Sequence, residues 1–199
     1  MSHSKTEDKF LETLMPVQGD GLKALDIGTG YGETGLFIRA HTFRNGRVDL
    51  TGVEPYRPYY EFQLGLGIYD YMIHGEGQDL PFGNNQFDLT IAQQVIEHLT
   101  PDEGLEMILE MKRVTRGRII LATPNGFYKG RAIDDNPLNL HRSVWTMQDF
   151  KDLGFNVELV TKNINSRALI WFAKAWFKLK RAEWDNGVLI AWSGNYDPR

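Results

Sequence analysis

The stretch Leu25-Asp-Ile-Gly-Thr-Gly-Tyr-Gly-Glu-Thr-Gly35 places one acid and a series of alternating glycines directly after a short apolar run. The run Leu22–Ile27 predicts a buried strand, and Glu33–Ala40 predicts the helix that follows it. Glycine lets the backbone turn sharply and approach a bound molecule closely. A molecule held there would meet the N–H groups and the positive dipole end of the helix. The stretch therefore predicts a cofactor-binding loop in an α/β protein.

Two cofactors fit this loop. Gly30-x-Gly32-x-x-Gly35 matches the fingerprint of dinucleotide-binding enzymes, in which a pyrophosphate lies on the helix. Asp26-x-Gly28-x-Gly30-x-Gly32 instead matches the glycine-rich motif of methyltransferases that use S-adenosylmethionine (SAM). A carboxylate at Asp26 would repel a pyrophosphate and favour the sulfonium and ammonium of SAM. The structural alternative is a strand–turn–helix in which the glycines serve only the turn.

Composition and length narrow the class of protein. The chain has 199 residues, a length typical of one domain, and we expect a core over about 20–162 with a C-terminal helix and last strand over 163–199. A net charge of -4 gives no basic signature for nucleic-acid binding. The absence of cysteine excludes disulfides and cysteine-ligated zinc. Without an apolar signal core or a long apolar run, we expect a cytoplasmic protein with no transmembrane segment.

Strands and helices are expected to alternate along the chain, which predicts a parallel sheet with right-handed crossovers. In such sheets, ligands bind at the carboxyl ends of the strands, at the point where the strand order reverses. We therefore look for functional residues just after each strand. The further expected strands are Val48–Val53, Tyr71–His74, Phe87–Ala92, Arg118–Ala122, Val157–Val160 and Val188–Trp192; the further helices are Phe10–Met15, Tyr59–Leu66, Asp102–Val114, with Leu105, Ile108, Leu109 and Met111 at helical spacing, and Thr146–Leu153.

Glu54 follows the second expected strand, roughly two dozen residues beyond the glycine loop, where an acid that binds ribose is expected. A carboxylate can accept hydrogen bonds from both hydroxyls of a vicinal diol, and it disfavours a 2′-phosphate. The alternative is an acid that pairs with the N-terminal dipole of the next helix. Combined with the glycine loop, the position favours ribose binding.

The segments after the later strands carry a family resemblance. Gly75-Glu-Gly-Gln-Asp-Leu-Pro-Phe82 is similar to the "G-D-A-x-x-L-P-F" of class I SAM-dependent methyltransferases. The segment from Phe87 to Leu99 resembles their "F-D-x-V-x-x-x-x-V-L-E-H-L". Ala122-Thr-Pro-Asn-Gly126 and the segment from Asn139 to Phe155 resemble the ubiquinone-type O-methyltransferases within this group. The resemblance covers residues from about 22 to 160.

The resemblance implies a three-layer α/β/α Rossmann-like fold, with a mostly parallel seven-stranded sheet whose last strand is antiparallel. It implies SAM as the cofactor, with Glu76 and Gly77 at the adenine. Glu76 stands where the family usually has aspartate. Gln93 or Gln94 would lie at the methionine end or line the acceptor pocket. The expected cofactor-binding residues are Asp26, Gly28, Gly30, Gly32, Glu54, Glu76, Gly77 and Gln93.

The expected reaction is methyl transfer from SAM to an oxygen or nitrogen of a small-molecule acceptor, which gives S-adenosylhomocysteine (SAH). Alignment can supply much of the acceleration, and a base is needed only if the nucleophile must lose a proton. His141, in the loop after the fifth strand, is the best candidate base, whereas His98 is more often structural in such a position. No histidine and carboxylate lie four residues apart on one expected helix, which would be the spacing of a helical metal site, so no metal is predicted.

Two other functions stay open. One is an NAD-dependent oxidoreductase, and the other is a methyltransferase-like protein that binds SAM without catalysis. The Asn/Asp-Pro-Pro-aromatic motif of DNA amino-methyltransferases is absent after the fourth strand, which argues against methylation of an exocyclic base nitrogen. A nucleic-acid partner is therefore not expected.

The stretch 168–181 is expected to form a helix that carries aromatic side chains over a wide arc, with four lysines and arginines. One interpretation is a helix that packs on the sheet with a solvated basic face. The other is contact with a membrane surface or with a second copy in a homodimer, which would admit a lipid-like acceptor.

Overall fold

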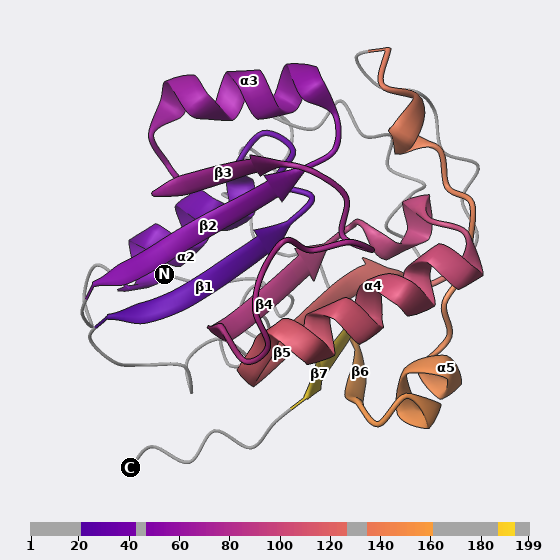
Figure 1. The fold of residues 1–199 in the computed structure, drawn as a ribbon. Coiled ribbons are helices and arrows are strands. Elements are labelled where there is room, and N and C mark those ends of the chain that lie inside the picture. Colours follow the sequence, from indigo (N-terminus) through magenta and orange to yellow (C-terminus); the bar gives the residue numbers. More distant parts are fainter. Residues whose placement is uncertain (1–20, 43–46, 127–134, 161–186, 194–199) are drawn as a thin grey trace, which may run out of the picture.

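The computed structural model describes residues 21–42, 47–126, 135–160 and 187–193 (Figure 1). A single seven-stranded sheet has the order β3-β2-β1-β4-β5-β7-β6. The strands are β1 Leu22–Ile27, β2 Val48–Glu54, β3 Tyr71–His74, β4 Phe87–Gln93, β5 Thr115–Pro124, β6 Asn156–Val160 and β7 Val188–Ser193. The helices are α2 Glu33–Thr42, α3 Arg57–Leu66, α4 Pro101–Val114 and α5 Met147–Asp152, with 3-10 turns η1 Ile96–His98 and η2 Pro137–Asn139.

The strand directions confirm the mostly parallel sheet. β1 pairs in parallel with β2 and β4, and the parallel pairing extends to β3 on one side and to β5 on the other. β7 runs antiparallel to both β5 and β6. The strand order reverses between β1 and β4, because β2 and β3 extend the sheet on one side of β1, and β4 and β5 extend it on the other. The carboxyl ends of β1 and β4 therefore form a topological switch point.

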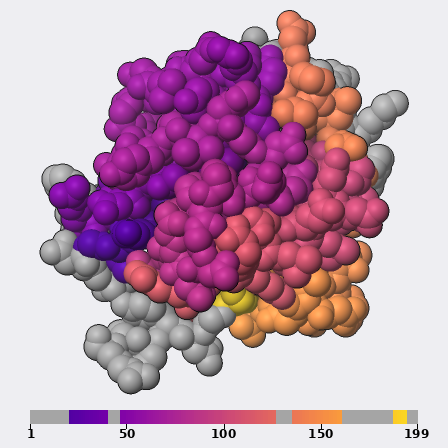
Figure 2. All heavy atoms as spheres, viewed as in Figure 1, coloured from indigo at the N-terminus to yellow at the C-terminus, as the bar shows by residue number. Residues whose placement is uncertain are grey.

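Alternate residues of the strands fill two separate hydrophobic clusters, since successive side chains of a strand point to opposite faces. Leu25 and Ile27 belong to a cluster that also contains Met107 of α4 and Phe150 of α5. Ala24 belongs to the other cluster, with residues of α2. Figure 1 shows α4 on the near side of the sheet and α2 behind β1 and β2. In Figure 2, viewed from the same side, the orange segments that follow β5 flank α4.

The sequence predicted every strand and all four helices of the described part, but the ends differ. β5 begins at Thr115 rather than at Arg118 and follows α4 directly. Gly117 allows this early start, because a Cβ there would lie 2.2 Å from the carbonyl oxygen of Asp88 in β4. The helices predicted over 10–15 and 168–181 lie outside the described residues. No helix among the described ranges is long and apolar enough to span a membrane.

The helix α4 begins with a capping box, in which the Thr100 side chain and the Glu103 side chain each bond the other's backbone N–H. Its buried face differs in part from the predicted one. Leu105 and Leu109 are exposed, although the spacing placed them with the apolar set. A surface helix buries a single stripe against the sheet. Here that stripe consists of Gly104, Met107, Ile108, Met111 and Val114.

The buried stripe of α4 generates a stability prediction. A Cβ at Gly104 would lie 2.5 Å from Cζ2 of the buried Trp145 ring, so Gly104→Ala should lower the free energy of unfolding by about 1–3 kcal/mol, despite alanine's better helix propensity. Gly65 in α3 has no atom within 4 Å of the added Cβ, and Gly65→Ala should raise it by about 0.5–1 kcal/mol. Urea unfolding measures the free energy of unfolding of both variants. If Gly104→Ala stabilised the protein as much as Gly65→Ala, the close packing of Trp145 on α4 would be contradicted.

Candidate active site

The sheet register brings the expected functional segments to one edge. Ile27 at the end of β1 lies opposite Val53 of β2 and Ala92 of β4. Glu54 and Gln93, the last residues of their strands, are therefore close in register to the start of the glycine loop. Because the carboxyl ends of parallel strands meet at one edge, the site straddles the switch point.

The glycine loop needs its glycines for two physical reasons. Gly28, Gly30 and Gly32 have φ of 71°, 49° and 85°, a region that other residues rarely adopt. A Cβ at Gly28 would lie 2.5 Å from Cγ2 of Val95, and one at Gly32 would lie 2.7 Å from Oε1 of Gln63. A Cβ at Gly30 would meet nothing within 4 Å. The loop is therefore closely packed at both ends and open in the middle, at Gly30.

Glu54 joins this loop to the end of β2. The residue is 4% exposed; its Oε2 accepts from the N–H of Gly30 at 2.9 Å and its Oε1 accepts from the N–H of Tyr56 at 2.9 Å. Burial raises the pKa of Glu54, while the two N–H groups act in the opposite direction. Each carboxylate oxygen has a further lone pair that could accept a ligand hydroxyl. The acid and the loop, predicted separately, are thus in direct contact.

Asp26 has a different environment from the one its charge suggested. The side chain is 1% exposed, and Oδ2 accepts from the hydroxyl of Tyr69 at 2.6 Å. Oδ1 has no hydrogen-bond partner, and burial raises the pKa of this carboxyl to about 7. The electrostatic argument against a pyrophosphate therefore rests on Glu54, which touches the loop. Contact between Asp26 and a cofactor stays a prediction.

The remaining predicted cofactor residues lie at the same edge. Glu76 is exposed after β3, and the neighbouring Gly77 is buried; a Cβ there would lie 2.9 Å from Cγ2 of Ile27. Gln93 is exposed at the end of β4, and its Oε1 accepts from the Thr34 hydroxyl at 3.1 Å. This bond crosses the switch point from β4 to the first turn of α2. Gln93 therefore borders the glycine loop.

Sequence reasoning missed two side chains that support the loop. Tyr69 holds Asp26 from the segment before β3. Gln63 of α3 is 1% exposed and its Nε2 donates to the carbonyl of Gly30 at 2.8 Å. Neither residue belongs to a motif, and their distance along the chain gives no signal. The sequence named Gln94 beside Gln93, but it did not predict the backbone conformation of Gln94: its φ of 56° is rare for a non-glycine residue, and such strain is often found at functional sites.

A second cluster lies where β4 and β5 end. The Glu97 carboxyl is 3% exposed, its Oε2 accepts from the Thr123 hydroxyl at 3.0 Å, and burial raises its pKa to about 8. The rings of His98 and His141 pack edge to face with centroids 4.9 Å apart. Burial, with His141 nearby, lowers the pKa of His98 to about 4. The sequence predicted His141 for this region, but it gave Glu97 no role; the Glu-His pair after the fourth strand was the available signal.

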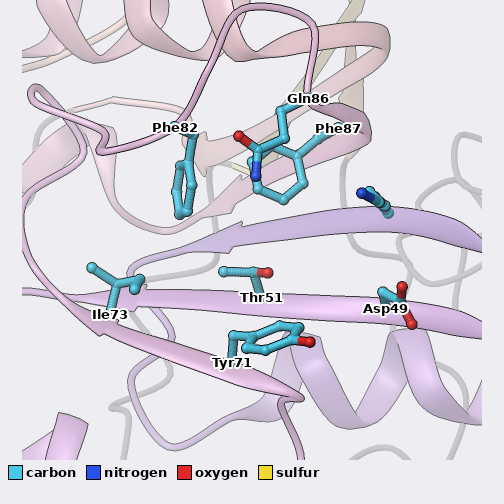
Figure 3. A pocket seen from close by; sticks show the side chains of 8 residues that line it. Asp49, Thr51, Tyr71, Ile73, Phe82, Gln86 and Phe87 are labelled. Carbon is cyan, nitrogen blue, oxygen red and sulfur yellow. The ribbon is translucent and has the colours of Figure 1, made fainter.

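A separate hollow of about 330 Å³ opens on the sheet face that carries the α4 cluster (Figure 3). It reaches the first residues of β1 and β2, away from the carboxyl ends of the strands. The connection from β3 to β4 contains no helix, so no helix from this connection packs on this part of the sheet. The lining residues are Lys23, Asp49, Thr51, Tyr71, Ile73, Phe82, Gln86 and Phe87.

Comparison with known families identifies a methyltransferase domain in this chain. Residues 25–122 match the family model described as a methyltransferase domain. This range runs from Leu25 in β1 through the glycine loop and Glu54 to Ala122 in β5. No curated protein matches the chain in sequence.

Many solved structures share the fold. A SAM-dependent methyltransferase from Archaeoglobus fulgidus is 16% identical, with a TM-score of 0.62, over 96% of this chain and 94% of that one. Phosphoethanolamine N-methyltransferase 2 from Haemonchus contortus, in complex with SAM, is 13% identical, with a TM-score of 0.67, over 96% and 52%. The [4+2]-cyclase SpnF is 18% identical, with a TM-score of 0.63, over 94% and 79%.

The environment of Asp26 generates a prediction about pH. Its pKa is about 7 in the folded protein, against an ordinary 3.8, so between these values the folded state holds a proton that the unfolded state releases. The free energy of unfolding should therefore fall as pH rises from about 4 to 7, by at most on the order of 1 kcal/mol per pH unit for this group. Asp26→Asn removes this dependence.

Urea unfolding of both proteins across that range measures the effect. The variant should gain stability relative to the wild type as pH rises, and Tyr69 can still donate to the amide oxygen at this position. A difference between the two proteins that stays constant with pH would show that Asp26 titrates normally.

Proposed function

We propose that this chain, which carries a class I SAM-dependent methyltransferase domain, transfers a methyl group from SAM to an oxygen or nitrogen of a small-molecule acceptor and releases SAH. The hydrogen bond between Glu54 and Gly30 carries the proposal, because it unites a diol-binding acid and an open glycine loop in one site. The two core clusters on opposite faces of the sheet support a three-layer arrangement.

Each predicted residue has a proposed role at this edge. Gly28, Gly30 and Gly32 give the cofactor access to the loop backbone, and Glu54 accepts hydrogen bonds from the ribose hydroxyls. The segment after β3 carries the proposed adenine contacts, at Glu76 and at the N–H of Gly77. The exposed amide of Gln93 and the buried carboxyl of Asp26 are proposed for the methionine end.

Methyl transfer at the sulfonium is an in-line displacement, so the protein's main task is to align the acceptor with the methyl group. Where the acceptor must lose a proton, His141 is the proposed base. It lies in the segment that follows β5 and η2, and its ring packs against that of His98. The lipid-like acceptor suggested by the aromatic stretch 168–181 depends on residues outside the described part.

The two alternatives make different predictions. An NAD-dependent oxidoreductase would bind NAD at the same loop, and Asp26, buried and bonded by Tyr69, would oppose a pyrophosphate less than an exposed carboxylate would. A non-catalytic SAM-binding protein would bind SAM without turnover, and the fold is compatible with this because fold does not determine function. The [4+2]-cyclase SpnF is similar to this chain in fold, although its name describes a different reaction. Formation of SAH with a cell extract as the acceptor source separates turnover from binding alone.

Thermal unfolding with SAM, SAH, NAD and NADP in parallel tests the cofactor. A ligand at about a hundredfold excess over its Kd adds about 2.7 kcal/mol to the stability of the folded state. We expect SAM and SAH to raise the midpoint and NAD and NADP to leave it unchanged. A shift with NAD alone would overturn the assignment.

Glu54→Gln should weaken SAM at least tenfold, about 1.4 kcal/mol, because an amide accepts hydrogen bonds through one oxygen only. Glu61→Gln in α3 is the matched control: Glu61 is exposed and pairs with Arg57, away from the loop. Calorimetric titration with SAM measures both variants. Equal affinity in wild type and Glu54→Gln would remove Glu54 from the cofactor site.

A further inference from the structure

We propose that Glu97, His98 and His141 form a binding site for a divalent transition-metal ion such as Zn²⁺. One ligand atom of each residue lies within 4.8 Å of the others. The expectation of no metal considered spacing along a single helix, whereas these residues come from η1 and from the segment after η2. The proposal is independent of methyl transfer, because it concerns binding of the ion itself.

Two buried atoms in this cluster have no hydrogen-bond partner. These are Oε1 of Glu97, a residue 3% exposed, and Nδ1 of His98. A buried polar atom left without a partner costs about 1–3 kcal/mol, so such atoms call for an explanation. Oε1 can donate a lone pair to a cation, and Nδ1 can do so in the tautomer that carries its proton on Nε2.

Neighbouring groups hold both side chains in position. Oε2 of Glu97 accepts from the Thr123 hydroxyl, which orients the carboxylate. The His98 ring lies beside the backbone of Leu140 and packs edge to face on the ring of His141. Carboxylate ligands of metal ions are commonly hydrogen-bonded by such neighbours.

Backbone hydrogen bonds bring His141 to the cluster. The N–H groups of Arg142 and Ser143 both donate to the carbonyl of Glu97, at 2.8 and 3.2 Å, and the Ser143 hydroxyl donates to the carbonyl of Ile96 at 3.1 Å. These bonds fasten the segment after η2 along η1. The third ligand is thus positioned by the fold and not by chance contact of exposed side chains.

The donor set indicates the kind of ion. Two imidazoles and one carboxylate suit Zn²⁺ and related transition metals, whereas Mg²⁺ and Ca²⁺ prefer oxygen ligands. Three protein ligands leave a coordination position open, as in catalytic zinc sites. The cluster lies just after β4, at the carboxyl edge of the sheet that also carries the proposed cofactor residues. A His141 nitrogen that binds the ion cannot also accept a proton, so the metal-bound form has no free base at this position.

Calorimetric titration of the chelator-treated full chain with ZnCl₂ tests the proposal, with MgCl₂ in parallel. We expect one equivalent of Zn²⁺ to bind, the thermal midpoint to rise, and Mg²⁺ to have no effect. Co²⁺ should give visible absorption bands typical of nitrogen and oxygen ligands. Glu97→Gln should weaken Zn²⁺ at least tenfold, and Thr123→Val, which only removes the bond that orients Glu97, should weaken it about 10–100-fold.

Two control variants match these changes. Thr90→Val removes a buried hydroxyl of β4 that bonds Thr115 instead of Glu97, and His74→Gln removes a histidine outside the cluster. Both should bind Zn²⁺ like the wild type. A SAM-induced rise in midpoint shows in each case that the variant is folded.

Two results would overturn the site. One is no Zn²⁺ binding to a wild type that still responds to SAM. The other is equal Zn²⁺ affinity in wild type, Glu97→Gln and Thr123→Val, which would assign the binding to other surface groups. Since SAM and Zn²⁺ are measured separately, loss of one response does not imply loss of the other.

Discussion

The hydrogen bond from the Gly30 N–H to the buried carboxylate of Glu54 is the constraint on which the site depends. A loop with three glycines at positive φ has many accessible conformations, and its shape is defined only where other groups hold it. Glu54 holds the middle of the loop, Gln63 holds the carbonyl of Gly30, and the N–H of Gly28 donates to Val53. The loop is thereby fixed above the switch point, where a bound molecule would contact both halves of the sheet.

Three carboxyl groups are buried along this edge, and each is held by a donor from another part of the chain. Tyr69 donates to Asp26, Gly30 to Glu54, and Thr123 to Glu97. Burial raises the pKa of all three groups, so their charged forms lower the stability of the fold. Apolar side chains at these three buried positions would not lower the stability of the fold in this way. Perturbed groups concentrated at one edge are typical of a functional site.

Local pattern predicted the elements well because strand and helix periodicity depends on near neighbours. The seven strands and the antiparallel last strand were expected from the family resemblance, and the observed sheet agrees with both. The sequence pattern was less reliable in predicting which of several similar apolar residues is buried, because the packing of the helix on the sheet decides this. Leu105 and Leu109 are as apolar as Ile108, yet only Ile108 faces the sheet. The early start of β5 likewise depends on how closely Gly117 can approach β4, which no spacing reveals.

Local sequence pattern was enough to predict the strand, loop and helix around Gly28 to Gly32, the acid at the end of β2 and the alternation of strands and helices that gives a parallel sheet. These features depend on residues that are near one another in the chain. The contact of Asp26 with Tyr69, and that of His141 with Glu97 and His98, follow only from the folded structure. Such contacts join residues far apart in the chain, and they are set by sheet register and by backbone bonds between loops. Residue spacing carries no information about either.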